Sequence, residues 1–163
     1  MRIIFSFIFL FVILLSNAQC SDITKLREVY AASKNDIKSC KKLYDLSKNC
    51  SSKLYPVQFT YNVISHLMEC HFIKNPFIKY KKFKESIKQL DNIIYLNPKC
   101  IEIRFLRYLT QLNSPVFLGY NANLDTDYKF ITNNISSENE DLRSFILTIL
   151  DNINNSNESN VSK

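Results

Sequence analysis

The apolar residues of this chain recur at spacings of three and four over most of its length, which is the pattern of amphipathic helices. The clearest stretch begins at Pro56, and its apolar residues form two stripes instead of one. A helix that is apolar on two faces is surrounded by other helices. We therefore predict a central helix from Pro56 to about Phe72. Its stripes are Val57, Tyr61, Ile64, Met68 and Phe72, and Phe59, Val63, Leu67 and Cys70.

The same spacing predicts helices on both sides of the central one. Two short helices precede it, the first after Asp22 and the second after Asn35 or Asp36, because these residue types favour the N-cap position. A long helix follows between the pairs Asn75-Pro76 and Asn97-Pro98. Further helices are predicted at about 99–112, 124–132 and around 142–153. The predicted buried residues of these later helices are Tyr80, Phe83, Ile87, Leu90 and Ile94; Ile101, Phe105, Leu109 and Leu112; and Leu142, Phe145, Ile149 and Ile153.

The content of glycine and proline supports an all-helical fold. The 163 residues include one glycine and four prolines, too few for the frequent turns of an all-β sandwich. Because 46% of the residues are hydrophobic, the chain can also form a substantial core. We predict an all-α single domain built of antiparallel helical hairpins.

The N-terminus has the layout of a signal peptide. Arg2 precedes an apolar run, 3–15, which is broken only by Ser6, and the small residues of Ser16-Asn17-Ala18 place a cleavage site after Ala18. The run is short for a membrane span, which needs ~20 apolar residues. We therefore expect an exported protein, periplasmic or extracellular and soluble after cleavage. An uncleaved anchor is one alternative.

The remaining domain boundaries follow from composition and from the cysteines. A helical domain is expected over 19–153, and the polar segment 154–163 is expected to be disordered. All five cysteines lie after the predicted cleavage site, and an odd number leaves at least one thiol unpaired. Their connectivity stays open; Cys40 could pair with Cys50, although free buried cysteines are slightly favoured. Lipid attachment at Cys20 is a further alternative, which Gln19, being neither small nor apolar, disfavours.

One segment resembles a known repeat. The stretch FKESIKQLDNIIYLNP, from Phe83 to Pro98, resembles the second helix of a tetratricopeptide repeat. Ser86 stands at the small-residue position of that repeat, Leu90 at its large apolar position, and Pro98 follows Ser86 by twelve residues. The flanking segments depart from the pattern. The resemblance therefore implies degenerate tetratricopeptide-like hairpins.

A second, overlapping resemblance concerns the setting of the protein. The stretch EIRFLRYLTQLNSPVFLGYNANLDTDYKFI, from Glu102 to Ile131, is similar to a segment of uncharacterised exported bacterial proteins. This resemblance implies an exported bacterial protein and gives no indication of an activity.

The candidate functional residues lie on the helix 99–112 and on the loop after it. The polar face of that helix carries two arginines one turn apart, which could clamp a carboxylate or phosphate of a partner. We favour the alternative that they bond carbonyls of the loop or pair with Glu102 or Asp127, because a long loop must satisfy its backbone. Gly119 is expected at positive φ, with Phe117 and Leu118 packing the loop against the core. The candidate partner-binding or loop-anchoring residues are Arg104, Arg107, Tyr108, Gln111, Phe117, Gly119 and Tyr120.

No pattern in the sequence indicates catalysis, a metal or a cofactor. His66 and Cys70 share a helix face but lack the further ligands that a zinc site requires. We therefore predict a binding or scaffolding module for a protein or peptide partner, with no enzyme activity. The alternative is a small exported hydrolase or transferase that uses His66 or His71.

The net charge of +6 suggests one further contact. Lysines between Lys74 and Lys88 could touch anionic lipid weakly. The aromatic residues interleaved with them are expected on the buried helix face, so a solvated lysine face is the favoured interpretation. No nucleic-acid partner is expected for an exported protein.

Overall fold

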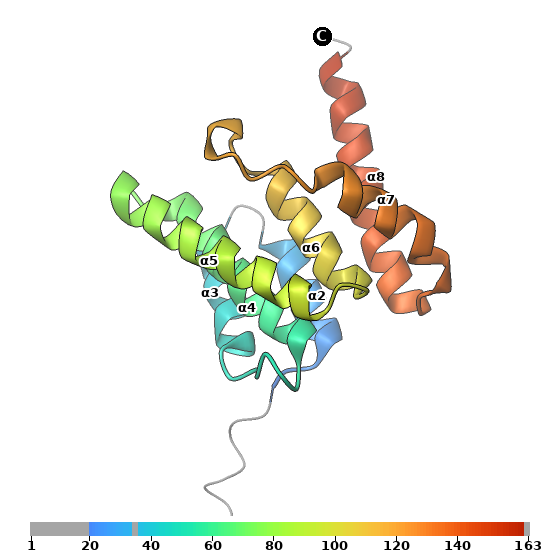
Figure 1. Cartoon of the computed structure of the whole chain (residues 1–163), viewed down its shortest axis with the longest axis horizontal. Coiled ribbons are helices and arrows are strands. Elements are labelled where there is room, and N and C mark those ends of the chain that lie inside the picture. The colour runs from blue at the N-terminus through green and yellow to red at the C-terminus, as the bar shows by residue number, and fades with distance from the viewer. Residues whose placement is uncertain (1–19, 34–35, 162–163) are drawn as a thin grey trace, which may run out of the picture.

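The computed structural model describes residues 20–33 and 36–161, with side chains described as far as Asn155. The predicted signal peptide and its cleavage site lie outside the described residues. Within the described part every regular element is helical, which confirms the all-α prediction (Figure 1). The α-helices are α2 (Ile23–Ala32), α3 (Ile37–Ser47), α4 (Pro56–Glu69), α5 (Pro76–Leu96), α6 (Ile101–Leu112), α7 (Leu124–Asn134) and α8 (Glu140–Val161). Short 3-10 turns are η1 (Cys70–Phe72), η2 (Val116–Leu118) and η3 (Ile135–Ser137).

Two helices begin at caps that the sequence predicts, and a third begins at the predicted Asn75-Pro76 boundary. The Asp22 carboxylate accepts a hydrogen bond from the Thr24 backbone N–H at 2.8 Å, and the Asp36 carboxylate caps α3 in the same way. The Asn75 side-chain oxygen accepts from the backbone N–H groups of the first turn of α5. Pro56 and Pro76 occupy first-turn positions, where a missing N–H costs no hydrogen bond.

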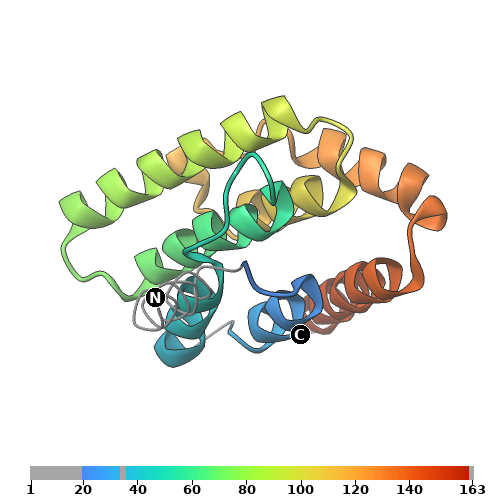
Figure 2. The same ribbon diagram turned by 90° about the horizontal axis from the view of Figure 1, so that it is seen from below.

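Helix α4 lies at the centre of the fold, as its two apolar stripes predict. It packs against α2, α3, α5 and α6. In Figure 2 it lies below α5, between that helix and the two N-terminal helices α2 and α3. Its residues Tyr61, Val63 and Ile64 are buried in the first core cluster.

Helix α6 joins this cluster to a second one. Ile103 and Leu106 belong to the first cluster, while Phe105 and Leu109 belong to the second, which α7 and α8 complete. Opposite faces of one helix therefore bury apolar surface against different neighbours. The residues of the second cluster are Ile101, Phe105, Tyr108, Leu109, Ile131, Leu142, Ile146, Ile149 and Leu150.

Three residues predicted to be buried are exposed. Tyr80 is 54% exposed because the first two turns of α5 extend beyond the helices that cover its later turns. Leu112 is 39% exposed at the last residue of α6, where the chain turns into the loop. Phe72 is 37% exposed because α4 ends at Glu69, and the tighter 3-10 turn moves Phe72 off the predicted stripe.

The C-terminal helix is longer than expected. It extends to Val161 and so includes most of the segment 154–163, for which the polar composition predicts disorder. Figure 1 shows its last turns standing clear of the other helices. No helix among the described residues is both long and apolar enough to cross a membrane.

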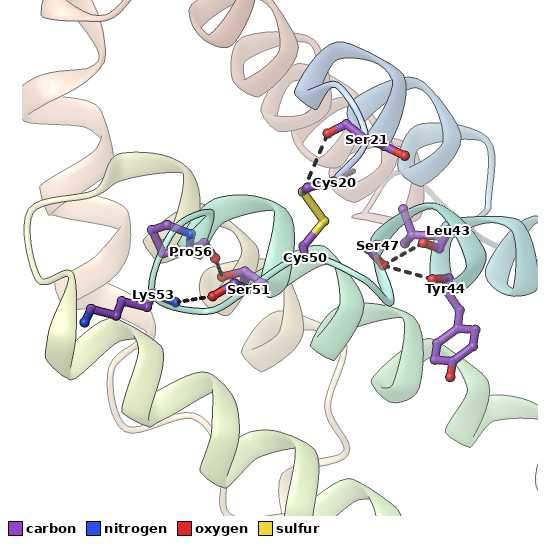
Figure 3. The surroundings of a disulfide bond; sticks show 10 residues. Cys20, Ser21, Leu43, Tyr44, Ser47, Cys50, Ser51, Lys53 and Pro56 are labelled. Carbon is purple, nitrogen blue, oxygen red and sulfur yellow. Dashed lines mark hydrogen bonds between the residues drawn. A yellow bond between two sulfur atoms is a disulfide. The ribbon is translucent and has the colours of Figure 1, made fainter. Parts of the chain in front are cut away.

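A disulfide joins the start of the described chain to the loop after α3. It links Cys20 to Cys50, across 30 positions of sequence (Figure 3). The pairing of Cys50 with Cys40, which the sequence left open, is therefore wrong, and Cys40 is a buried free thiol. Cys70 and Cys100 are free as well. In this arrangement the sulfur of Cys20 is bonded to another sulfur and does not carry a lipid.

Candidate functional site

The two candidate arginines of α6 converge on one carboxylate of α7. Asp127 lies in the first turn of α7 and is fully buried. The Arg107 guanidinium, 8% exposed, donates to both of its oxygens, from Nε to Oδ2 at 2.6 Å and from Nη2 to Oδ1 at 2.7 Å. Burial alone would lower the pKa of Arg107, but the bonds to Asp127 outweigh it and raise that pKa above its ordinary value.

Arg104 completes the same charge cluster. Its Nη1 donates to Asp127 Oδ1 at 2.8 Å, and its Nε donates to the backbone carbonyl of Pro98 at 2.6 Å. Its guanidinium carbon lies 4.3 Å from the centre of the Phe130 ring. The prediction that at least one guanidinium is buried and bonded to Asp127 is confirmed. Because both groups are already engaged, neither is free to clamp an anion of a partner in this conformation.

The contact between this cluster and the loop comes from Gln111. Its side-chain N–H group donates to Asp127 Oδ2 at 3.3 Å, and its side-chain oxygen accepts from the Asn123 backbone N–H at 2.9 Å. Of the expected options, pairing with Asp127 is the one that the structure shows, and the bond to the loop backbone comes from Gln111 and not from the arginines. Tyr108 takes no part in the charge cluster. It packs in the second core cluster, with its ring 5.6 Å from that of Tyr128.

The loop between α6 and α7 contacts α5 through two side chains. Leu118 packs against Phe83, and the Tyr120 ring lies edge-on to the same residue at 6.1 Å. The Tyr120 hydroxyl donates to Asp91 at 2.8 Å. Burial and the neighbouring Asp91 raise the pKa of Tyr120 well above its ordinary value.

Gly119 has the positive φ that its position predicts, at 65°. A left-handed residue between Leu118 and Tyr120 reverses the chain so that both flanking side chains face α5. Phe117 does not follow them, and its predicted role in packing the loop against the core is wrong. It is 86% exposed, and its neighbour Val116 is 82% exposed, because the η2 turn directs both away from α5.

His66, Cys70 and His71 have different surroundings in the structure. The His66 ring is half-buried beside Tyr44, at 5.3 Å between ring centres, and its Nδ1 has no hydrogen-bond partner. The Cys70 thiol donates to the His66 backbone carbonyl, and burial raises the pKa of that thiol, whereas a nucleophilic cysteine needs a lowered one. His71 is exposed. In the described part of the chain, no three His, Cys, Asp or Glu side chains lie close enough to hold a metal.

A second buried charge cluster was missed by the sequence analysis. Glu102 pairs with Arg27 of α2 and not with Arg104 or Arg107: Arg27 Nε donates to Oε1 at 2.8 Å and Nη2 to Oε2 at 2.6 Å. The Tyr61 hydroxyl donates to Oε1 at 2.7 Å. The cluster therefore joins α2, α4 and α6. The sequence contains an indication of this cluster. Arg27 lies three residues before Tyr30, so helical spacing places its charged side chain on the same side of α2 as an apolar residue.

These contacts leave one exposed apolar turn on the loop between α6 and α7, formed by Val116 and Phe117. No family model, curated protein or solved structure matches the chain.

Proposed function

We propose that the protein is an exported, non-catalytic helical binding module that contacts a protein or peptide through the loop 114–123. One observation carries the proposal: Val116 and Phe117, two adjacent apolar side chains, are more than four-fifths exposed at the tip of this loop. Large apolar side chains on a projecting turn are costly in water unless another surface covers them. An aromatic side chain that fills a partner's pocket is a common source of binding energy.

The loop is held in one shape before any partner arrives. Gln111 bonds its C-terminal end, Tyr120 bonds Asp91, and the Ser114 hydroxyl bonds the Thr110 carbonyl at 2.7 Å. Backbone hydrogen bonds close the η2 turn from Leu118 to Pro115 and from Gly119 to Val116, both at 3.0 Å. A preformed loop loses less conformational entropy on binding, so more of its contact energy appears as affinity.

Export is supported by the disulfide as well as by the leader pattern. A disulfide such as Cys20–Cys50 persists in oxidising compartments and is rare in the cytosol. We further propose that the described helices form one domain, because α6 supplies residues to both core clusters.

The tetratricopeptide-like arrangement also remains a proposal. Ser86 is 4% exposed and Leu90 is fully buried, as the small and large apolar positions of the repeat require. Helix α5 ends at Leu96, just before Pro98, which suits the closing proline of the repeat. On this proposal α4 and α5 form the degenerate unit, α6 begins the next one, and the binding loop follows α6.

Site-specific photo-cross-linking tests the proposed binding surface. A benzophenone side chain at position 117 should capture a discrete partner from the envelope fraction of the producing cells. The same group at Leu54, which is 71% exposed on another loop, is the control. Equal capture at both positions, or none at position 117, would contradict the proposal.

A double substitution distinguishes this function from the enzymatic alternative. Replacing His66 and His71 with alanine should leave the cross-link at position 117 intact. If the protein instead loses its biological function while its circular dichroism spectrum stays unchanged, the alternative of a small exported hydrolase or transferase is favoured.

A further inference from the structure

The outward face of α5 carries an apolar pair at each end. Phe77 and Ile78 in its first turn are 84% and 58% exposed, and Tyr95 and Leu96 in its last turn are 80% and 66% exposed. The pairs are eighteen residues apart, which is five full helical turns. They therefore point in the same direction, about 27 Å apart along the helix axis.

Lysines fill the same face between the two pairs. Lys81, Lys84 and Lys88 are exposed, and helical spacing places them on the side opposite the buried Phe83 and Leu90. The acids nearby offset little of this charge: Glu85 is exposed among the lysines, while Asp91 is bonded by Tyr120. The face is therefore positive as well as apolar at its ends.

This arrangement contradicts part of one expectation from the sequence. The favoured interpretation, a solvated lysine face, depends on the burial of the aromatic residues among the lysines. Phe83 is buried as expected, but Phe77 and Tyr80 are exposed, beside the lysines. The face thus combines the two ingredients of interfacial membrane binding, aromatic or aliphatic anchors and positive charge.

The described chain leaves this face uncovered. Helix α5 packs against α4, η1 and α6, and its residues Phe83 and Asp91 contact the loop between α6 and α7. In Figure 2 it runs along one edge of the molecule, with no other element outside it. A straight helix at the edge of the molecule can lie along a flat surface over its whole length.

We infer that this outward face of α5, from Phe77 to Leu96, rests on an anionic lipid surface. Lysine is depleted in protein–protein interfaces, whereas it is favoured against anionic headgroups. Aromatic side chains at both ends suit the headgroup boundary, where their rings are partly desolvated. The contact goes beyond the proposed partner-binding loop, because it uses a different surface and brings the module to a membrane.

Vesicle co-sedimentation of the purified protein tests this inference. We expect binding to vesicles of phosphatidylcholine with about one third phosphatidylglycerol, little binding to phosphatidylcholine alone, and loss of binding at high salt. The variants F77S/Y95S and K81Q/K84Q/K88Q should each reduce the partition coefficient at least about tenfold.

Two matched controls separate this face from the rest of the surface. F117S removes an equally exposed phenylalanine from the loop, and K38Q/K41Q/K42Q removes three exposed lysines from α3. Both should bind vesicles as the unchanged protein does. Circular dichroism of each variant should match that of the unchanged protein.

Several results would overturn the inference. These are failure to bind anionic vesicles, equal binding to both vesicle types, and loss of binding in the control variants to the same extent. Capture of a protein that depends on Phe77 and Tyr95 without vesicle binding would assign the face to a protein partner instead. The F117S variant keeps the two proposals apart, because it should abolish capture by a cross-linker placed at the neighbouring position 116 and leave vesicle binding unchanged.

Discussion

Arg107 and Asp127 form a two-bond ion pair between α6 and α7, at 2.6 and 2.7 Å, with both side chains buried. Arg104 shares the same carboxylate, and Asp91 lies 3.7 Å from Arg107 Nη1 as a further, half-exposed acid. A buried charge without its partner is strongly destabilising, since it has neither water nor a counter-charge. Asp127 is therefore the residue on which the geometry of the candidate site depends.

Replacing this acid should destabilise the protein strongly. Asp127→Asn removes the carboxylate that both arginines share and leaves Arg107 with the more distant Asp91, 3.7 Å from its Nη1. We therefore expect the free energy of unfolding to fall by about 3–5 kcal/mol. Asp125→Asn is the matched control, because Asp125 is an exposed acid in the same first turn of α7. It should change stability by less than about 0.5 kcal/mol. Equal effects in urea denaturation would show that the buried pair contributes little.

The conformation of Gly119 gives a second prediction. A Cβ atom added there would have no heavy atom within 4 Å, so the cost of Gly119→Ala comes from its φ of 65° alone. We expect a loss of about 1–2 kcal/mol in urea denaturation. Gly119→Asn should lose less, because asparagine tolerates left-handed backbone better than alanine does. An alanine variant as stable as the unchanged protein would show that the loop can adopt another turn.

The helix starts could be predicted from the sequence because they depend on local contacts. An Asp22 or Asn75 side chain reaches backbone groups only two or three residues away, so its role is contained within a few positions. The pairing of Arg107 with Asp127 was predictable as one of several alternatives. The choice between Asp127 and Glu102 as the partner was not predictable. It depends on α2, which brings Arg27 to Glu102 although the two residues are 75 positions apart in the sequence.

The exposure of a side chain was harder to predict than the side of the helix on which it lies. The spacing of Tyr80 places it correctly on one side of α5, but spacing does not report how far the neighbouring helices extend along that side. The same limit applies to Phe117, whose exposure depends on the turn that Gly119 permits. The pairing of Cys20 with Cys50 likewise depends on tertiary structure, since the spacing of five cysteines allows many connectivities.

Core substitutions should separate the buried from the exposed positions of α5 and α6. Leu90 and Phe105 are both fully buried, so Leu90→Ala or Phe105→Ala should lower the free energy of unfolding by ~2–5 kcal/mol. Lys84 is exposed, and Lys84→Ala should stay within about 0.5 kcal/mol of the unchanged protein. Three equal values from denaturant titration would mean that the helix faces are assigned incorrectly.

The disulfide should contribute about as much to the free energy of unfolding as one of these buried side chains. Closing a loop of 30 positions restricts the unfolded chain, and Cys50→Ser should therefore lower the free energy of unfolding by about 3–4 kcal/mol.

Burial raises the pKa values of the free thiols of Cys40, Cys70 and Cys100. Iodoacetamide should thus modify these three slowly in the native protein and fully after unfolding without reductant. Mass spectrometry that finds five modified cysteines without reductant would contradict the assigned pairing.

The last prediction concerns the pH dependence of stability. Burial of His66, together with the nearby positive charge of Lys82, lowers the pKa of the imidazole below its ordinary value of 6.5. As the pH falls through 6.5, the unfolded chain takes up a proton at this position while the folded chain does not. The unfolded state then binds more protons, so stability decreases as the pH is lowered.

We therefore expect the urea concentration at the unfolding midpoint to decrease when the pH is lowered from 7.5 to 5.5. In His66→Gln this decrease should be smaller. His71→Gln is the matched control, because His71 is exposed five residues further along the chain. It should show the same pH dependence as the unchanged protein. Glu69 lies 3.8 Å from His66 Nδ1 and favours the protonated ring, so it opposes the effect of burial. If His66→Gln steepened the loss of stability at low pH, Glu69 would dominate, and the protonated imidazole would be stabilised in the folded state.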